Sequence, residues 1–206
     1  MPIQHLLHKV FAVPVLYDLA QAIAGAAKLR AMLAPEVEVL GPQGDALDLG
    51  GGTGMYRSLL PGAWRYTCLD PDPQKLSGFR LKYPNDTALE ASACAIPCPD
   101  ASVDLCLMVA VSHHLTSAEF TAAMAETRRV LRPGGVLLFV DAVWQPENWR
   151  GRFLWSVDRG SSPKAGSDIR RIIADHLEVE HSQEWRVHHG YLLLRGRRRA
   201  ESNDKH

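Results

Sequence analysis

A cluster of glycines follows a short apolar segment that ends at Leu49, and its members are Gly50, Gly51, Gly52 and Gly54. Glycine permits sharp turns and lets a ligand approach the backbone where a Cβ atom would collide, so the bare amides of such a loop can bind a carboxylate. A dinucleotide-binding loop of the form G-x-G-x-x-G would need a third glycine at Met55. A nicotinamide dehydrogenase is therefore the weaker alternative.

Two aspartates accompany the loop. Asp48 lies within the first apolar segment, and Asp70 lies 22 residues later, at the end of the next one. A carboxylate at the end of a strand can accept hydrogen bonds from both hydroxyls of a ribose. Either feature alone is commonly a structural turn. Together, the glycine loop and the two acids indicate a nucleoside site.

Two adjacent histidines, His113 and His114, follow a further apolar segment. Imidazole titrates closest to neutral pH, so either side chain could accept a proton from a phenol or a hydroxyl group. The alternative is that they pack or cap at the entry to a helix. Both roles stay open at this point.

The composition predicts one domain. The chain has 206 residues, of which 46% are hydrophobic and 22% charged, and its 23 basic residues balance 23 acidic ones. Balanced charge favours a small-molecule partner over nucleic acid or an anionic membrane. We expect the basic run Arg195–Arg199 to be a solvated tail.

The cysteines are Cys68, Cys94, Cys98 and Cys106, and they lack the CxxC spacing of zinc ligands. We expect small core residues and no metal site, which suits a reducing, cytoplasmic location. We expect neither a signal peptide nor a membrane span. The oligomeric state is expected to be a monomer or homodimer.

Alternating apolar segments and helical patterns predict an α/β fold of the Rossmann-like, doubly wound kind, with a mostly parallel seven-stranded sheet and an antiparallel C-terminal hairpin. The predicted strands are Ala46–Leu49, Trp64–Leu69, Thr87–Ala91, Val103–Ala110, Val136–Val140, Leu177–Val187 and Tyr191–Arg195. The predicted helices between them are Met55–Leu60, Gln74–Lys82, Ser117–Leu131 and Gly166–His176.

The single domain 1–206 divides into five segments. A helical lead is expected over the mouth or edge of the sheet, and a Trp- and Arg-rich insertion is expected over the substrate site. The segments are the lead 1–40, a core 41–143, the insertion 144–164, a closing helix and hairpin 165–198, and a tail 199–206.

Four blocks in order resemble the class I S-adenosylmethionine-dependent methyltransferases, and in particular the small-molecule branch similar to the ubiquinone and menaquinone biosynthesis methyltransferases. The likeness covers about Ala46 to Val143. The blocks are ALDLGGGTG from Ala46, CLD from Cys68, IPCPDASVD from Ile96 and VLRPGGV from Val130. The resemblance implies S-adenosylmethionine as cofactor and S-adenosylhomocysteine as product.

The resemblance implies that the glycine loop holds the methionine part of the cofactor and that Asp70 holds the ribose. Ser92 stands where the family usually has the aspartate that binds the adenine amino group, a change that costs on the order of 1 kcal/mol. The amide of Ala93 can still donate to the ring. The predicted cofactor-binding set is Asp48, Gly50, Gly51, Gly52, Gly54, Asp70, Pro71, Ser92, Ala93 and Val109.

The predicted acceptor is a small aromatic or lipophilic metabolite, methylated on oxygen, carbon or nitrogen by in-line displacement. Aromatic side chains of the lead and insertion suit such a ligand, although core or helix packing is their alternative role. The predicted substrate residues are Tyr17, His113, Trp144, Trp149 and Phe153, and His113 and His114 are the candidate bases.

Other classes of protein remain alternatives. The segment after Val109 lacks the Asn/Asp-Pro-Pro-aromatic motif of the enzymes that methylate nucleic-acid bases. A nucleic-acid or protein methyltransferase therefore rests on the basic tail alone. A methyltransferase-like cofactor-binding or regulatory protein without turnover is the other alternative, motivated by Ser92.

Overall fold

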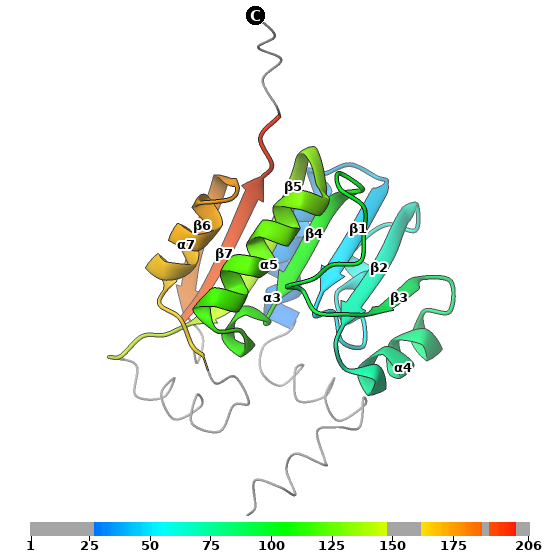
Figure 1. Ribbon diagram of the computed structural model, residues 1–206, viewed down its shortest axis with the longest axis horizontal. Helices are drawn as coiled ribbons and strands as arrows, with labels where there is room; N and C mark the ends of the chain where they lie inside the picture. Colours follow the sequence, from blue (N-terminus) through cyan, green and yellow to red (C-terminus); the bar gives the residue numbers. More distant parts are fainter. Residues whose placement is uncertain (1–26, 148–161, 187–189, 201–206) are drawn as a thin grey trace, which may run out of the picture.

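One seven-stranded sheet forms the centre of the computed structural model, which describes residues 27–147, 162–186 and 190–200 (Figure 1). Its order is β3-β2-β1-β4-β5-β7-β6, and β7 alone is antiparallel to its two neighbours, β5 and β6. The strands are β1 Gly44–Leu49, β2 Trp64–Asp70, β3 Thr87–Glu90, β4 Val103–Val109, β5 Leu131–Val143, β6 Glu178–Arg186 and β7 Gly190–Arg197. The predicted mostly parallel sheet with a closing antiparallel hairpin is confirmed.

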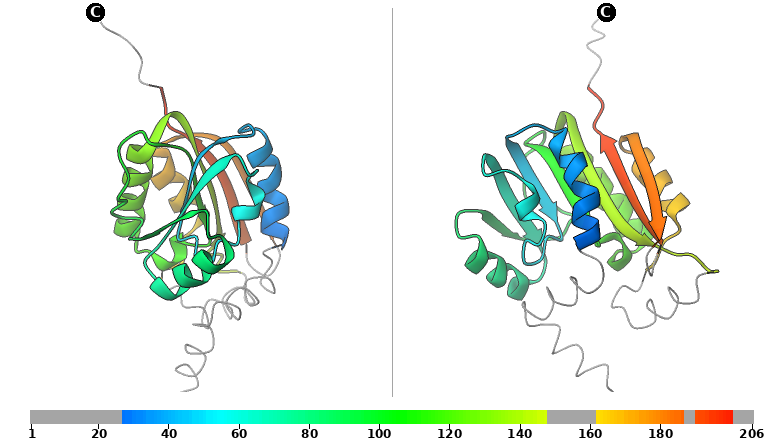
Figure 2. Two further views of the ribbon diagram at one scale, coloured as in Figure 1. Left: turned by 90° about the vertical axis from the view of Figure 1, so that its right-hand side faces the viewer. Right: turned by 180° about the vertical axis from the view of Figure 1, so that it is seen from behind.

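Helices cover both faces of this sheet (Figure 2). On one face, α5 (Ser117–Val130) and α7 (Gly166–Ala174) bury their apolar side chains against the strands. On the other face, α3 (Ala27–Glu38) and α4 (Pro73–Lys82) do the same. Two apolar clusters therefore enclose the sheet, as the doubly wound prediction requires.

The described end of the lead lies on a face of the sheet, whereas we expected the lead over its mouth or edge. Leu29, Leu33 and Val37 of α3 recur with helical spacing and are buried against the strands. Glu36, also on α3, accepts a hydrogen bond from Arg195 at 2.8 Å and ties the helix to β7. Residues 1–26 lie outside the described part of the chain.

Helix α5 begins at a capping box. The Thr116 hydroxyl accepts from the Glu119 amide at 3.2 Å, and the Glu119 carboxylate accepts from the Thr116 amide at 2.7 Å. The helix ends one residue before the predicted Leu131, because Leu131 already pairs with Val103. For the same reason β5 begins five residues before the predicted Val136.

The predicted helix Met55–Leu60 is reduced to a single 3₁₀ turn, Arg57–Leu59, since Pro61-Gly62 follows directly. The solvated-tail prediction for the basic run was also wrong. Arg195 and Arg197 lie within β7 and both pair with Glu180. These ion pairs use the charges to join strands β6 and β7.

In the residues that the structure describes, no helix combines the length and the apolar character that crossing a membrane requires.

Candidate functional site

The glycine loop turns sharply directly after β1, at the carboxyl end of the parallel strands. Gly50, Gly52 and Gly54 have φ angles of +70°, +57° and +75°, a region that side-chain-bearing residues rarely adopt. A Cβ atom on Gly50 would lie 2.6 Å from a methyl carbon of Val111, and one on Gly54 would lie 2.5 Å from the ring of Phe79. Both the backbone angles and the close packing therefore require glycine.

Asp70, at the end of β2, fastens the loop. Its carboxylate accepts hydrogen bonds from the Gly52 amide at 3.0 Å and from the Asp72 amide at 2.9 Å, and the side chain is almost fully buried. Lys75 lies 3.9 Å from the same carboxylate. Burial raises the pKa of Asp70, although Lys75 and the two amides oppose that shift. Each carboxylate oxygen keeps a lone pair with which it can accept from a ligand hydroxyl.

Asp48, on β1, lies buried beneath the loop. The hydroxyl of Tyr66 donates a hydrogen bond to its carboxylate. Burial raises the pKa of Asp48 to about 7 from 3.8; the bond from Tyr66 lowers it, and the charge of Asp70 adds to the rise. The two carboxyl groups therefore form one coupled, buried acidic pair under the glycine loop.

Asp48 gives the ligand-free protein a pH-dependent stability. Because the folded state binds this proton more tightly than the unfolded state, the contribution of Asp48 to the free energy of unfolding falls as the pH rises from 3.8 to about 7. The fall is about 1.4 kcal/mol for each pH unit between the two pKa values. We expect Asp48→Asn to remove it, as measured by urea unfolding at about pH 5 and about pH 8.

Asp168, an exposed carboxylate on α7, provides the matched control. The Asp168→Asn protein should keep the pH dependence of the wild type. If wild type and Asp48→Asn lost the same stability between the two pH values, burial of a protonated Asp48 would be the wrong explanation.

A cavity of about 280 Å³ opens beside Asp70. Its walls combine the carboxylate with apolar side chains, as a ribose and a purine ring would require. The lining residues are Gly50, Leu69, Asp70, Pro71, Lys75, Ser92, Ala93, Ala110, Val111, His114 and Leu115. A smaller pocket of about 20 Å³ shares Gly50 and Ala110 with it and is also lined by Asp48, Gly51 and Val109.

Ala110 marks the point where the two cavities meet. It has a φ angle of +57°, in a region that non-glycine residues rarely adopt, and its amide donates to Val140 at 2.8 Å. This conformation turns the chain sharply after β4 and sends residues 111–115 along the larger cavity.

His113 follows this turn and is held by a buried aspartate that the sequence did not reveal. Its ring nitrogen Nδ1 lies 2.7 Å from Asp141, at the end of β5. The same carboxylate accepts from the hydroxyl of Ser112 at 2.6 Å and from the His113 amide at 3.2 Å. Burial raises the pKa of Asp141, but the charge and hydrogen bonds of His113 and the bond from Ser112 outweigh it and lower the pKa overall.

The Asp141 contact fixes the tautomer of His113. An ionised carboxylate can only accept, so the hydrogen of the neutral ring is on Nδ1, which leaves Nε2 with its lone pair. That is the form in which an imidazole can act as a general base.

Comparisons with known proteins identify a family and a fold. Residues 47–139 match the family described as a methyltransferase domain. These residues form a methyltransferase domain. The class I methyltransferase that the sequence blocks led us to expect is confirmed at the level of family and fold.

The methyltransferase domain has relatives of known sequence and known structure. The chain is 38% identical over 104 residues to an uncharacterized methyltransferase of Mycobacteroides abscessus, covering 48% of this chain and 39% of the relative. The chain thus spans about two fifths of the length of that relative.

Two solved structures share the fold at low sequence identity. A putative methyltransferase of Bacillus halodurans has a TM-score of 0.71 and 14% identity, covering 83% of this chain and 99% of the other. Geranyl diphosphate C-methyltransferase of Streptomyces coelicolor was solved with S-adenosyl-L-homocysteine and has a TM-score of 0.67 at 12% identity. The match covers 82% of this chain and 76% of the other.

The methyltransferase domain brings together part of the predicted site. Eight of the ten predicted cofactor residues line the two cavities, whereas Gly52 and Gly54 line neither. Those two glycines shape the loop, Gly52 through its bond to Asp70. The Ser92 hydroxyl accepts from the Cys94 amide at 3.1 Å and so also stabilises its own turn.

The predicted histidines have different surroundings. His114 is exposed and lines the larger cavity, whereas His113 is buried against Asp141. Their ring centres lie 4.1 Å apart. His114 thus lies among the residues that line the larger cavity, whereas His113 lines neither of the two cavities at the carboxyl ends.

Of the predicted aromatic substrate residues, Trp144 alone lies in the described residues. It is partly buried, follows β5, and its amide donates to the Lys164 carbonyl at 2.7 Å. It lines neither cavity. Tyr17, Trp149 and Phe153 lie outside the described residues, so their substrate roles stay predictions.

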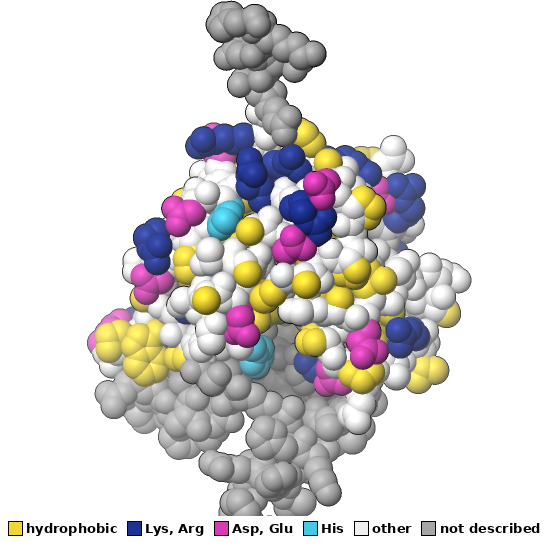
Figure 3. Space-filling view, in the orientation of Figure 1, with side chains coloured by type: hydrophobic (Ala, Val, Ile, Leu, Met, Phe, Trp, Pro, Cys, Tyr) yellow, Lys and Arg dark blue, Asp and Glu magenta, His cyan; other side chains and the backbone are white. Residues whose placement is uncertain are grey.

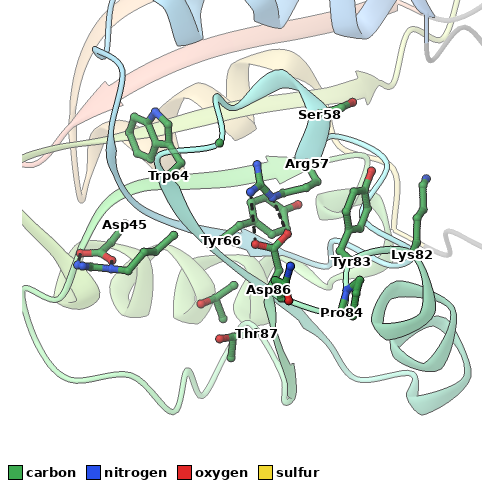
Figure 4. A pocket seen from close by; sticks show the side chains of 14 residues that line it. Asp45, Arg57, Ser58, Trp64, Tyr66, Lys82, Tyr83, Pro84, Asp86 and Thr87 are labelled. Atoms are coloured by element: carbon green, nitrogen blue, oxygen red, sulfur yellow. Dashed lines mark hydrogen bonds and ion pairs between the residues drawn. The ribbon is translucent and has the colours of Figure 1, made fainter.

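A third cavity, of about 820 Å³, lies at the amino ends of β2 and β3 (Figure 4). Four of its charged side chains form two pairs: Arg57 donates to Asp86 at 2.6 Å, and Arg65 to Asp45 at 2.5 Å. No predicted site residue lines it. The predicted cofactor residues that line a cavity do so at the carboxyl ends of the parallel strands instead.

On the face drawn in Figure 3, lysine and arginine side chains gather at the end of the molecule opposite the carboxyl ends of the parallel strands. Among the described arginines, Arg129 pairs with Glu126 at 2.8 Å and Arg132 with Asp104 at 2.6 Å.

Proposed function

We propose that this chain transfers a methyl group from S-adenosylmethionine to an oxygen, carbon or nitrogen atom of a small aromatic or lipophilic acceptor. The observation that carries the proposal is the pair of adjoining cavities at the carboxyl ends of β1, β2 and β4, with a buried carboxylate beside each. Such a crevice is where ligands bind in open α/β sheets. The family match supports the cofactor.

The residues present fit this cofactor. Asp70 would accept hydrogen bonds from the ribose hydroxyls, and Pro71, Ala93 and Leu115 supply apolar walls for the adenine. Asp48 and the amides of the glycine loop would hold the charged amino-acid end. When bound, S-adenosylmethionine supplies a methyl group on a positively charged sulfur.

The protein's own contribution is positioning and proton transfer. Displacement at a methyl carbon needs donor and acceptor in line, and holding them in that geometry supplies a large part of the rate. We propose that His113, oriented by Asp141, accepts the proton of the acceptor through Nε2. His114 would contact the nucleoside side of the site.

The four cysteines are free thiols, two of them buried and two partly buried. Free thiols favour a reducing compartment, and we propose the cytoplasm as the location. We also propose that the protein is a monomer or a homodimer.

Mass spectrometry of metabolite extracts tests the proposed reaction. The wild-type protein with S-adenosylmethionine is expected to produce compounds 14 mass units heavier, the difference between CH₃ and H, that are missing with Asp70→Ala. The same products are expected to form much more slowly with His113→Asn, by the roughly 100-fold or more that a general base contributes. Cofactor binding without any such product across broad extracts would favour a non-catalytic binding protein instead.

A further inference from the structure

A buried lysine lies beside His113. Lys164 has 6% of its surface exposed, and its ammonium donates to three backbone carbonyls: Ser112 at 2.8 Å, Ser162 at 3.0 Å, and Leu115. An ammonium has three hydrogens and no acceptor, so these bonds satisfy it completely. The ammonium also lies 5.8 Å from the ring centre of Phe120, within cation–π range.

These contacts enclose the turn that carries His113. Ser112 and Leu115 are the residues before and after the two histidines, and the Ser162 amide donates to the His113 carbonyl at 3.1 Å. On the other side, Asp141 binds the ring and amide of His113. The turn is therefore fixed from β5 on one side and from residues 162–164 on the other.

The charge of Lys164 suits this place. Carbonyl oxygens at the end of a turn carry partial negative charge that attracts an ammonium, and the carboxylates of Asp141 and Glu119 add to the attraction. Burial lowers the pKa of Lys164, while the two carboxylates oppose that shift. A side chain without an ammonium would remove a donor from each of these three carbonyls, of which Ser112 keeps its bond from the Leu115 amide at 3.1 Å, and the lost bonds are costly where they are shielded from water.

We propose that Lys164 is a positioning residue that locks the turn 112–115 and thereby holds the His113 ring against Asp141. The catalytic consequence rests on the proposed role of His113 as base. The positioning itself does not depend on that role, because it concerns contacts within the protein. Leu115 and His114 also line the larger cavity, so the same contacts of Lys164 hold one of its walls in place.

Solvent exchange of the His113 Nδ1 hydrogen, followed by NMR, tests this positioning. Lys164→Met keeps the length and removes all donors, and is expected to speed that exchange about tenfold or more, as a local opening of the turn would. Lys164→Gln keeps a donor, so its exchange rate should lie between those of the wild type and Lys164→Met. Lys28→Met, which changes an exposed lysine on α3, should match the wild type. The Asp141→Asn protein identifies the signal, which should disappear in it.

A core amide separates positioning from general destabilisation. The exchange of the Leu47 amide in buried β1 should stay as slow in Lys164→Met as in wild type. Faster exchange of both signals by the same factor, or His113 exchange at the wild-type rate, would overturn the proposal. If Lys164→Met does not fold, a wild-type rate in Lys164→Gln overturns it equally.

Titration with S-adenosylhomocysteine keeps this test separate from the proposed function. Failure of the wild type to bind it would defeat the cofactor assignment and leave the Lys164 result standing. A wild-type exchange rate in the lysine variants would defeat the positioning role and leave cofactor binding standing.

Discussion

Asp70→Ala is expected to weaken the binding of S-adenosylhomocysteine by roughly 100-fold or more, since two charge-assisted hydrogen bonds of about 1.5 kcal/mol each would be lost. The loss has a second cause. Asp70 also accepts from the Gly52 and Asp72 amides, so its removal loosens the glycine loop itself. Isothermal titration calorimetry at fixed pH measures the effect.

Two variants accompany that measurement. Asp70→Asn keeps the shape and one acceptor oxygen, and it should bind between wild type and Asp70→Ala. Glu90→Ala removes an exposed carboxylate that is paired in register with Asp70 on the neighbouring strand β3, and it should bind as wild type. Binding by Asp70→Ala within about threefold of wild type, a difference below 1 kcal/mol, would rule out Asp70 as the ribose-binding residue.

Asp141→Ala is expected to lower the free energy of unfolding by about 2–5 kcal/mol, because removing the carboxylate leaves several buried donors without an acceptor at about 1–3 kcal/mol each. Asp141 is buried, and its carboxylate accepts from Ser112, His113 and its neighbour Ala142. Without it, these donors and the imidazole are left in the interior with no acceptor. Urea unfolding monitored by circular dichroism measures the change.

The pH dependence of this loss has a definite sign. The pKa of Asp141 is lowered below 3.8 in the folded state, so its stabilisation is present above that pH and is lost as the pH falls through the folded value. The difference between wild type and Asp141→Ala should therefore shrink in acid. Asp175→Ala, at an exposed site after α7, should change stability by less than about 0.5 kcal/mol. A loss below about 1 kcal/mol in Asp141→Ala would contradict the burial argument.

The strands and the glycine loop could be predicted because their signals are local. An apolar segment followed by glycines and an acid encodes a strand, a turn and a ligand-facing carboxylate within a few residues. β1, β2 and β4 therefore begin and end within two residues of the predictions. The antiparallel pairing of β7 with β6 followed from the short turn between them.

The surroundings of His113 could not be predicted in the same way. Asp141 lies 28 residues and Ser162 lies 49 residues further along the chain, and their approach depends on the order of the strands. The one available signal was the position of Asp141, an acid at the carboxyl end of a predicted strand, where Asp70 also lies. Lys164 gave no signal, because nothing in a sequence distinguishes a buried lysine from an exposed one.

The predicted end of helix α5 and the predicted solvated tail differ from the structure for the same reason, which is contact between residues far apart in the sequence. Leu131 leaves α5 because Val103 is available as a strand partner, and the arginines of β7 are neutralised by Glu180 across the sheet. Tertiary contacts decide both outcomes over local propensity.

Calorimetric titration of the wild-type protein with S-adenosylmethionine, S-adenosylhomocysteine and NAD⁺ tests the central claim most directly. We expect both sulfur-containing nucleosides to bind at one site per chain, with dissociation constants on the order of micromolar, and NAD⁺ to show no binding. The absence of binding by S-adenosylmethionine and S-adenosylhomocysteine, or binding of NAD⁺ alone, would contradict the assignment of these cavities to a methyl donor.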